Sequence, residues 1–189
     1  WKVQEYRMTE LEFELEFKKR KLQKRKQRRM ELLIIGAHLG VVLVLLYWMF
    51  GIGMVHGRSM RPAYREGDLF LYQRRLFQEL EYGDVVVIHR QDLERDIVKR
   101  IAGKPGDVID LDEMGHLIRN GERAAETEIL FGEQDRDDWI TFPYTVPEGS
   151  YFCLGDNRPR SEDSRELGAF RRQEITGKVF AQFRLSSVK

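Results

Sequence analysis

The chain contains three successive patterns of hydrophobic and polar positions. Residues 9–29 are mostly polar and charged, residues 32–55 are apolar, and residues 56–189 contain short apolar runs separated by turn residues. About 20 consecutive apolar residues are enough for a helix to cross the hydrocarbon core of a bilayer. The pattern therefore predicts a membrane-spanning helix that is followed by a separate domain.

The apolar run Leu32–Val55 is 24 residues long and carries no formal charge unless His38 is protonated. Tyr47 and Trp48 lie toward its end, and such aromatic side chains collect at membrane surfaces. The alternatives are a core helix of a soluble domain and a cleaved signal peptide. The length of the run, and the lack of an A-x-A-like sequence after it, disfavour a signal peptide. A core helix would not explain the charged residues that precede the run.

The stretch before the run, residues 18–29, reads "KKRKLQKRKQRR" and contains nine basic and no acidic residues. Lys and Arg accumulate on the cytoplasmic side of membrane helices. We therefore predict that residues 1–31 are cytoplasmic and that residues 56–189 are extracytoplasmic. The formal net charge of the whole chain is only +1, which gives no general sign of nucleic-acid binding. We interpret the basic stretch as a topology signal with attraction to anionic lipid, in preference to an RNA-binding segment.

Two periodicities compete in residues 1–31. A capping-box spacing and two favourable i,i+4 ion pairs predict a helix, and these involve Thr9 with Glu12, Glu14 with Lys18, and Glu16 with Arg20. A period of two, which is typical of a strand, runs through Leu11, Phe13, Leu15 and Phe17. We predict a helix that continues into the span. Because the first residue is Trp1 rather than Met, we also expect the chain to be a trimmed form.

The external domain, residues 56–189, is predicted to be mainly β. It contains short β-rich runs that follow Gly-Asp or other turn residues, among them "GDLFLYQR", "GDVVVIHR", "DIVKRIAG", "DVIDLD", "HLIRNGE", "SYFCLGD" and "GKVFAQFRLS". Asn120-Gly121 has the composition of a tight hairpin turn. Many short strands with frequent turns favour an antiparallel sheet or open barrel. The polar, acidic stretch 124–143 is predicted to be a loop or a hairpin between sheets.

Candidate chemistry begins with Ser59 in "GRSMRP", a segment that by itself is typical of a surface turn. A serine nucleophile needs a base. The chain has four histidines, and none has a recognisable catalytic context: His38, His56, His89 and His116. A Ser-His-Asp triad stays open, because its members are neighbours in space rather than in sequence. The single cysteine, Cys153, cannot form an internal disulfide, and no cluster has zinc-site spacing, so we expect no metal or cofactor.

A lysine can replace histidine as the base if its amine is neutral at working pH. Its ordinary pKa of about 10.4 must then fall by several units, which burial in an apolar site can cause. Lys99 is the candidate, because Ile97, Val98 and Ile101 surround it in sequence. In a strand, Lys99 and Arg100 would point to opposite faces. The alternative is that Lys99 is an ordinary exposed lysine.

Three segments together favour the catalytic alternative. They are "GRSMRP" at 57–62, "DIVKRIAGKPGD" at 96–107 and "GDNRPRSEDSRELG" at 155–168, and they follow a single predicted span in this order. This arrangement closely resembles type I signal peptidase, a membrane-bound Ser-Lys endopeptidase that removes signal peptides from exported preproteins. The resemblance runs from the span to about Phe180. A lysine rather than a histidine at position 99 resembles the bacterial form.

The resemblance implies a role for each matching residue. Ser59 corresponds to the nucleophile, Lys99 to the general base, and Ser161 to a hydroxyl that orients the lysine amine. The Ser59 backbone amide corresponds to one oxyanion donor. Gly57 occupies a position that carries a second hydroxyl donor in some members, so this chain resembles the glycine-bearing subtype common in Gram-positive bacteria. Five further positions match the supporting part of the last motif: Asp156, Asn157, Arg158, Asp163 and Arg165. We expect Asp163, Arg165 and Arg100 to form an ion-pair network.

The resemblance also implies substrate, partners and location. Shallow pockets would accept small residues before the cut, and the candidate pocket residues are Val55, Met60, Tyr64 and Val98. The expected partners are the signal peptides of exported preproteins, the lipid bilayer and the protein-export machinery, without nucleic acid. The expected location is the cytoplasmic membrane, with one span and an extracytoplasmic catalytic domain. Two other classes are a soluble Ser-Lys self-cleaving repressor and a non-catalytic membrane-anchored relative. The span and "GDNR" disfavour the first, and the presence of both Ser59 and Lys99 disfavours the second.

Overall fold

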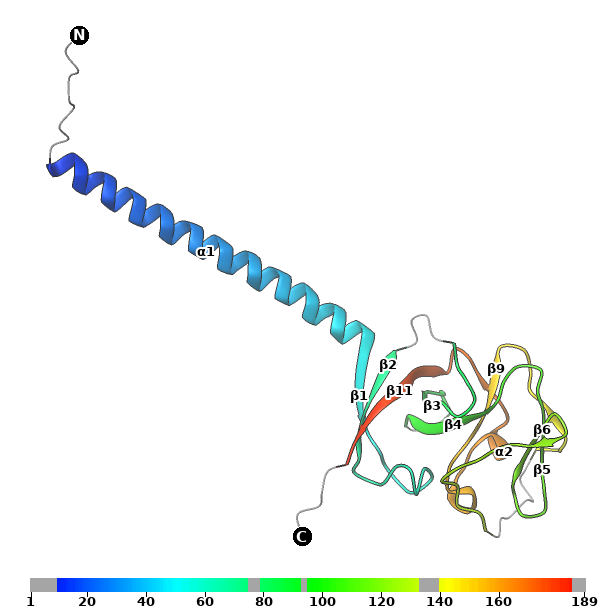
Figure 1. The fold of residues 1–189 in the computed structure, drawn as a ribbon. Helices are drawn as coiled ribbons and strands as arrows, with labels where there is room; N and C mark the ends of the chain where they lie inside the picture. The colour runs from blue at the N-terminus through cyan, green and yellow to red at the C-terminus, as the bar shows by residue number, and fades with distance from the viewer. Residues whose placement is uncertain (1–9, 75–78, 93–94, 133–139, 185–189) are drawn as a thin grey trace, which may run out of the picture. The chain divides into compact units, whose positions relative to one another are not determined.

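The structure is a computed structural model that describes residues 10–74, 79–92, 95–132 and 140–184 (Figure 1). It divides into two compact units, residues 1–47 and residues 48–189. The described residues of the first unit belong to one long helix, α1 (Glu10–Met49), which ends two residues past the boundary between the units. The prediction of a helix that continues into the span, rather than a strand, is therefore confirmed from Glu10 onward. Residues 1–9 lie outside the described residues.

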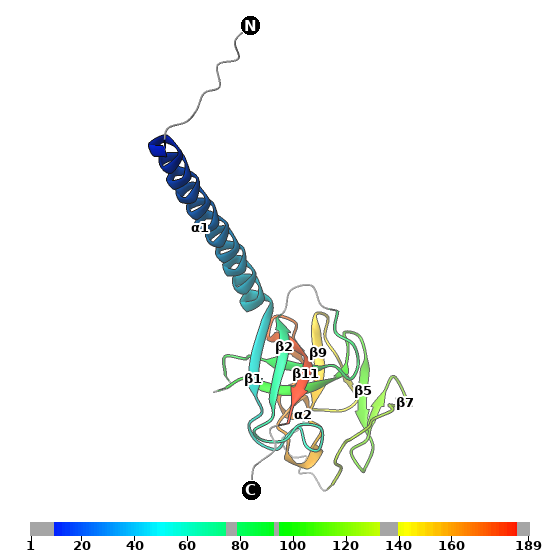
Figure 2. The same cartoon turned by 60° about the vertical axis from the view of Figure 1, so that its left-hand side comes forward.

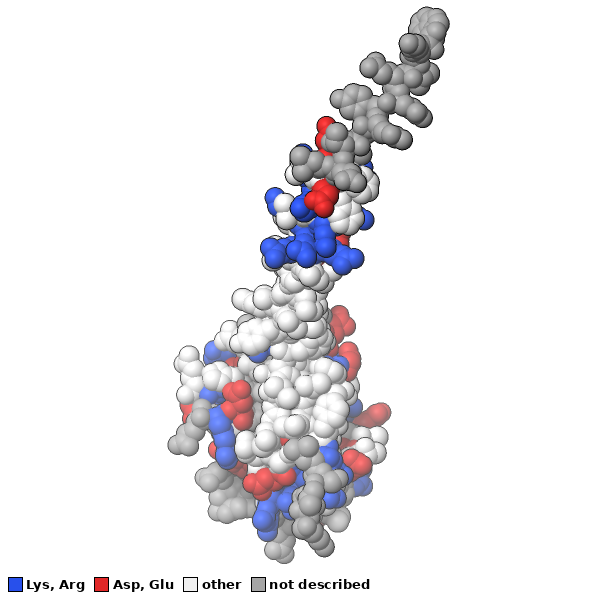
Figure 3. Space-filling view, turned by 90° about the vertical axis from the view of Figure 1, so that its left-hand side faces the viewer, with Lys and Arg blue, Asp and Glu red and all other residues white. Residues whose placement is uncertain are grey.

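Helix α1 separates charge from apolar surface along its length. Figure 3 shows the Lys and Arg side chains gathered in one zone of the helix, next to a stretch without charged side chains. The predicted i,i+4 contacts are present, because Lys18 and Arg20 each lie 3.4 Å from the glutamate four residues before them. The helix is long and apolar enough to cross a membrane, and its apolar window is not buried inside the protein.

The helix ends six residues earlier than the sequence pattern predicts. Phe50–Met54 form strand β1, which pairs antiparallel with β2 (Leu69–Arg74). In "FGIGM", glycines alternate with apolar residues, and side chains in a strand also alternate between faces. A Cβ at Gly51 would overlap the ring of Tyr72, and a Cβ at Gly53 would overlap the ring of Phe70. The glycines thus admit two aromatic rings against β1. The strand was not evident from the sequence, because "FGIGM" continues the apolar run without a break.

The second unit is mainly β with antiparallel strand pairing, as predicted, and its described residues form two sheets (Figures 1 and 2). The larger sheet has the strand order β1-β2-β11-β3-β4-β9-β10, and the smaller one has the order β7-β6-β5-β8. The remaining bounds are β3 (Val85–Ile88), β4 (Ile97–Gly103), β5 (Val108–Leu111), β6 (Leu117–Arg119), β7 (Glu122–Arg123), β8 (Tyr144–Thr145), β9 (Ser150–Leu154), β10 (Phe170–Arg171) and β11 (Ile175–Phe183). A short 3-10 helix η1 (Arg158–Arg160) and a short helix α2 (Ser164–Leu167) follow β9.

Strand β3 lies at the centre of the core and is buried on both faces. Val86 and Ile88 pack into one apolar cluster, and Val85 and Val87 pack into another. A strand covered on both sides needs a continuous apolar run, which explains the sequence "VVVI". A third cluster packs β5, β6 and β9 together around Phe152. The burial of β3 places its neighbour β4, which carries Lys99, at the centre of the domain.

Two loop predictions have different outcomes. Asn120 and Gly121 both have positive φ, 56° and 82°, and form the two-residue turn between β6 and β7, so the hairpin prediction is confirmed. For the stretch 124–143, the described residues form a loop that connects β7 to β8 and not a hairpin between sheets. Isolated bridges join this loop to Pro62 and to Asn157. Residues 133–139 lie outside the described residues.

Candidate active site

A cleft of about 530 Å³ brings Ser59 and Lys99 together on one surface of the second unit. One part of its wall is apolar and the other is charged. The apolar part comes from β1 and the residue after it, β2 and β3, and includes Ile52, Val55, Phe70 and Val87. The charged part lies before β4 and around η1, and includes Arg95, Asp96, Arg160 and Glu162.

Ser59 lies in the turn that follows β1, and it is half-buried. Gly57 opens this turn with φ of 85°, a conformation that favours glycine. Met60 anchors the turn from below, because its side chain is almost completely buried in the core. From the other side, the Asn157 backbone N–H donates to the Ser59 carbonyl at 2.9 Å, and its side-chain amide donates to the Arg58 carbonyl at 3.0 Å. The turn is therefore held by β1, the core and the "GDNR" loop.

Lys99 lies in β4 opposite Val86 of β3, and only 3% of its surface is exposed. Among the described residues, no carboxylate lies within ion-pair distance of its amine. Burial lowers the pKa of Lys99 below its ordinary value; Asp163 opposes this effect by attraction, and Arg165 adds to it by repulsion. A buried amine without a direct counter-ion has the properties that a neutral lysine base requires.

Ser161 is buried, and its hydroxyl has no hydrogen-bond partner among the residues that the structure describes. An unpartnered buried hydroxyl is unusual in a folded protein and calls for an explanation. The lack of a side chain at Gly155 explains how Ser161 comes near Ser59. A Cβ at position 155 would overlap both Ser161 Oγ and the Ser59 carbonyl oxygen. The missing side chain at Gly155 thus lets Ser161 pack beside the backbone of the Ser59 turn.

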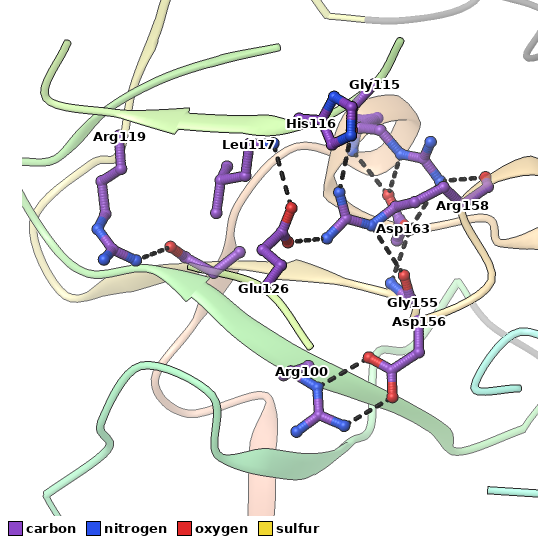
Figure 4. Close-up of polar contacts among 12 residues, drawn as sticks. Arg100, Gly115, His116, Leu117, Arg119, Glu126, Gly155, Asp156, Arg158 and Asp163 are labelled. Carbon is purple, nitrogen blue, oxygen red and sulfur yellow. Dashed lines mark hydrogen bonds and ion pairs between the residues drawn. The ribbon is translucent and has the colours of Figure 1, made fainter. Parts of the chain in front are cut away.

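Two ion pairs support this region. Arg165 donates to both oxygens of Asp163 at 2.8 and 3.0 Å, and both side chains are fully buried. Arg100 donates to both oxygens of Asp156 at 2.8 and 2.6 Å (Figure 4). We predicted Arg100 in one network with Asp163 and Arg165, but its carboxylate partner is Asp156. The reason is the alternation of side chains along β4, which turns Arg100 away from the face that carries Lys99.

The predicted pocket residues are only partly brought together. Val55, Met60 and Val98 line the cleft. Tyr64 packs against the same apolar cluster without lining the cleft, and burial raises its pKa. The predicted oxyanion donor, the Ser59 amide, makes no hydrogen bond to a backbone carbonyl of the described residues. At Gly57 there is open space for a side chain, but the positive φ would strain one.

The histidines are distributed over the molecule. His56 lines the cleft, whereas His38 belongs to α1. His89 contacts Asp96 at 2.7 Å on the surface, and His116 contacts Asp112 at 2.8 Å. His116 also packs against the Phe131 ring. Asp96 lines the cleft with Ser59, but neither His89 nor His116 does, which does not favour the Ser-His-Asp alternative.

Sequence reasoning missed one prominent residue, Glu126. It forms an ion pair with Arg158, and the two side chains are only 13% and 2% exposed (Figure 4). Glu126 also accepts a hydrogen bond from the Leu117 backbone N–H at 3.2 Å. The residue lies in an acidic, polar stretch, where nothing local distinguishes it from its exposed neighbours. Its partner lies 32 positions later in the chain, so only the fold reveals the pair.

Comparison with known proteins adds independent information. The family model described as signal peptidase, peptidase S26, matches residues 28–184. Signal peptidase I of Bacillus licheniformis is 34% identical over 150 residues, which cover 74% of this chain and 80% of that protein. Signal peptidase I S of Bacillus subtilis is 35% identical over 151 residues, which cover 74% and 80%. Signal peptidase I of Streptococcus pneumoniae is 30% identical over 166 residues, which cover 69% and 79%.

Among solved structures, the crystal structure of a signal peptidase I from Enterococcus faecalis is similar, with 25% identity and a TM-score of 0.43. The match covers 56% of this chain and 99% of that chain. The family model covers most of this chain, and it includes the turn with Ser59, β4 and the "GDNR" loop. The chain therefore belongs to the signal peptidase family, peptidase S26, whose members are serine peptidases.

Proposed function

We propose that this protein is a membrane-anchored endopeptidase that removes N-terminal signal peptides from exported preproteins, with Ser59 as nucleophile and Lys99 as base. The single observation that carries the mechanism is the burial of Lys99 in the cleft that Ser59 lines. No ordinary structural role requires a lysine there, because a charged amine is costly to bury without a counter-ion. As a neutral base beside a serine hydroxyl, the same amine has a function.

The proposed reaction begins with attack of Ser59 Oγ on the carbonyl carbon of the scissile peptide bond. Neutral Lys99 takes the hydroxyl proton as the C–O bond forms. The Ser59 backbone amide stabilises the negative charge that develops on the carbonyl oxygen. The C–N bond then breaks, and the Lys99 ammonium gives its proton to the leaving amine. The products of this step are the free mature protein and a signal peptide esterified to Ser59.

Water completes the cycle. Lys99, which is neutral again, takes a proton from a water molecule that attacks the ester carbonyl. The bond to Ser59 Oγ breaks, and the proton passes from the ammonium to the serine. Ser161 orients the lysine amine in both half-reactions, and this role would explain why its buried hydroxyl has no other partner.

The substrate would bind as an extended strand between two strand edges. β1 pairs only with β2, and the first half of β4 pairs only with β3 among the described residues. Both edges therefore have backbone groups available for strand addition. Val55, Met60 and Val98 would contact small side chains before the cut, while Tyr64 would support them from the core.

Helix α1 would anchor the enzyme, with residues 1–31 in the cytoplasm and the peptidase domain outside. The basic zone of the helix supports this orientation. The anchor would hold the cleft near the membrane surface, where the apolar segment of a preprotein leaves the bilayer. Contact with the protein-export machinery would fit the same location.

The test is cleavage of a purified preprotein by the full chain in detergent, with mass spectrometry to identify the cut. We expect one cut after the signal peptide, and no product with Ser59→Ala or Lys99→Ala. Ser164→Ala provides a control serine that lies outside the proposed dyad. Turnover by either dyad variant near the wild-type rate would overturn the assignment, because nucleophile and base act as one unit.

A further inference from the structure

We propose that Glu126 is a positioning residue for the Ser59–Lys99 site, which it reaches through Arg158 and the "GDNR" loop. The expected loss of rate rests on the proposed function. The expected loosening of the "GDNR" loop does not depend on it. Glu126 does not line the cleft. Its effect would therefore be on the placement of the nucleophile, not on substrate binding.

The first link is the contact between Glu126 and Arg158. The Arg158 guanidinium is 2% exposed, so it needs a carboxylate close by. Glu126 is the carboxylate that pairs with it among the described residues. Phe131 covers the guanidinium, with its ring centre 5.7 Å away. A charge this well shielded from water fixes the geometry of the groups to which it donates.

The second link is the contact between Arg158 and the loop backbone. Arg158 Nε donates to the Gly155 carbonyl at 3.1 Å, and one Nη donates to the Gly115 carbonyl at 3.2 Å (Figure 4). Gly155 is the residue that packs against both Ser161 Oγ and the Ser59 carbonyl. A shift of Gly155 would therefore disturb both the Ser161 side chain and the backbone of the Ser59 turn.

The third link is the backbone of the loop that contains Glu126. The Leu130 N–H donates to the Asp156 carbonyl at 2.8 Å, and the Arg158 N–H donates to the Leu130 carbonyl at 3.0 Å. These bonds bracket Asn157, whose own N–H donates to Ser59. The ion pair and the backbone bonds thus clamp residues 155–158 from the side opposite the nucleophile.

The pKa of Lys99 provides a readout that separates positioning from a change in the base. Besides burial, the groups with the largest effects on the pKa of Lys99 are Asp163, Arg165, Glu162 and Cys153, and Glu126 is not one of them. Removal of the Glu126 charge should therefore lower the rate without moving the pH midpoint of activity. A substitution that altered Lys99 itself would move that midpoint.

The experiment compares Glu126→Gln with Glu122→Gln in the full chain in detergent. Glu122 lies on β7, four residues before Glu126 in the chain, and its side chain is exposed. For Glu126→Gln we expect kcat to fall on the order of 10- to 100-fold, because small displacements of reacting groups cost that much. KM and the pH midpoint should stay unchanged, and Glu126→Asp should recover part of the rate. Glu122→Gln should behave like the wild type.

A second readout does not depend on activity. Hydrogen exchange of the Asn157 amide, followed by NMR, should be about tenfold faster in Glu126→Gln than in Glu122→Gln, because local opening of the loop costs less. Equal exchange in the two variants would overturn the inference. If wild-type chain failed to cleave preproteins, the proposed function would fall, while the exchange result would still decide the role of Glu126.

A double variant separates positioning from stability. Glu126→Leu with Arg158→Met replaces the buried pair by apolar side chains, which commonly preserves the stability of a fold. It also removes the donor to the Gly155 carbonyl. We expect a melting temperature near that of the wild type with a kcat that stays low. A folded double variant with wild-type kcat would show that the pair serves only stability, and would contradict the proposal.

Discussion

Lys99 and Arg100 are neighbours on β4, and their charges lie in opposite environments on the two faces of the strand. Lys99 is buried without a carboxylate at ion-pair distance among the described residues, and its pKa is lowered chiefly by burial. Arg100 is 28% exposed and makes two hydrogen bonds to Asp156. These hydrogen bonds are the main reason that the pKa of Arg100 is raised. One face thus favours loss of a proton, and the other favours retention of a charge. A strand can supply both because its side chains alternate.

The comparison teaches that the surroundings on each face of the strand, together with the residue type, determine what a basic side chain does. Both residues are cationic in the unfolded chain. Folding removes water from one and supplies a matched carboxylate to the other. Replacement of each residue by the other basic type should therefore have very unequal effects on activity.

The largest effect should come from Lys99→Arg. An arginine side chain stays protonated in proteins, so it cannot take the Ser59 proton. We expect cleavage to fall by at least about a thousandfold, measured as kcat/KM on a preprotein. Arg100→Lys keeps a charge beside Asp156 and should retain activity within about tenfold, although it loses the paired geometry. If Lys99→Arg kept more than about a tenth of the activity, the neutral-lysine mechanism would be wrong.

The next effect concerns stability on the other face. Arg100→Met leaves the buried Asp156 carboxylate without its partner, and we expect the free energy of unfolding to fall by about 2–3 kcal/mol at pH 7. Arg184→Met is the matched control, because Arg184 is about half exposed and lies 3.7 Å from Asp68. Its loss should cost no more than about 0.5 kcal/mol. Urea unfolding of the full chain in detergent provides the measurement.

The pH dependence of Arg100→Met has a definite sign. Burial raises the pKa of Asp156, and Arg100 opposes that rise. Without Arg100 the pKa rises further, so the folded state binds a proton that the unfolded state has released. The variant should therefore lose less stability at pH 5 than at pH 7. A loss that grew as the pH fell would contradict this account of the pair.

Much of this arrangement follows from local sequence. The long apolar helix, the short antiparallel strands and the turn at Asn120-Gly121 each have a nearby signal in composition or periodicity. Ser59 and Lys99 do not, because a turn serine and a strand lysine are common. They became candidates only through the order of three motifs and their resemblance to a family.

Other features depend on contacts between distant residues. The run "FGIGM" continues an apolar segment, and only its pairing with Tyr72 and Phe70 shows that β1 is a strand. Asp156 and Asp163 both follow Arg100 by more than 50 residues. The sequence therefore does not show which of the two carboxylates pairs with it. The Glu126–Arg158 pair had no local signal at all. Charge partners across a fold are chosen by geometry, which a single sequence does not contain.

A smaller effect should distinguish two buried serines in the "SEDS" segment. Ser161→Ala removes a hydroxyl without a partner, so stability should not fall. We expect kcat to decrease about tenfold with an unchanged KM, because the Lys99 amine loses its orientation. Ser164 Oγ accepts a hydrogen bond from the Cys153 backbone N–H at 2.9 Å. Ser164→Ala should therefore lower the free energy of unfolding by about 1 kcal/mol and leave kcat near the wild-type value.

The reverse outcome, in which Ser161→Ala loses stability and keeps its rate, would assign Ser161 a packing role. A loss of both stability and kcat in Ser161→Ala and in Ser164→Ala would mean that the two serines act together on the fold. Kinetics and urea unfolding on the same preparations separate these cases.

The smallest effect should be a gain in stability from Lys99→Met. Methionine has a similar length and no charge, so the variant removes the cost of burying an amine. We expect the free energy of unfolding to rise by about 1 kcal/mol at pH 7, the lower end of the range for such replacements, because Asp163 attracts the charged amine and offsets part of that cost.

The sign of the pH dependence follows from the lowered pKa of Lys99. Between the folded and unfolded pKa values of Lys99, the unfolded chain binds the proton and the folded chain does not, so wild-type stability rises with pH. The advantage of Lys99→Met should therefore shrink as the pH is raised toward the ordinary lysine pKa of about 10.4, by about 1.4 kcal/mol for each unit by which folding lowers the pKa of Lys99. The pH at which it begins to shrink should coincide with the midpoint at which wild-type kcat/KM rises, since both report one proton on Lys99. A stability advantage that stays constant with pH, together with a rising rate, would assign the catalytic titration to another group.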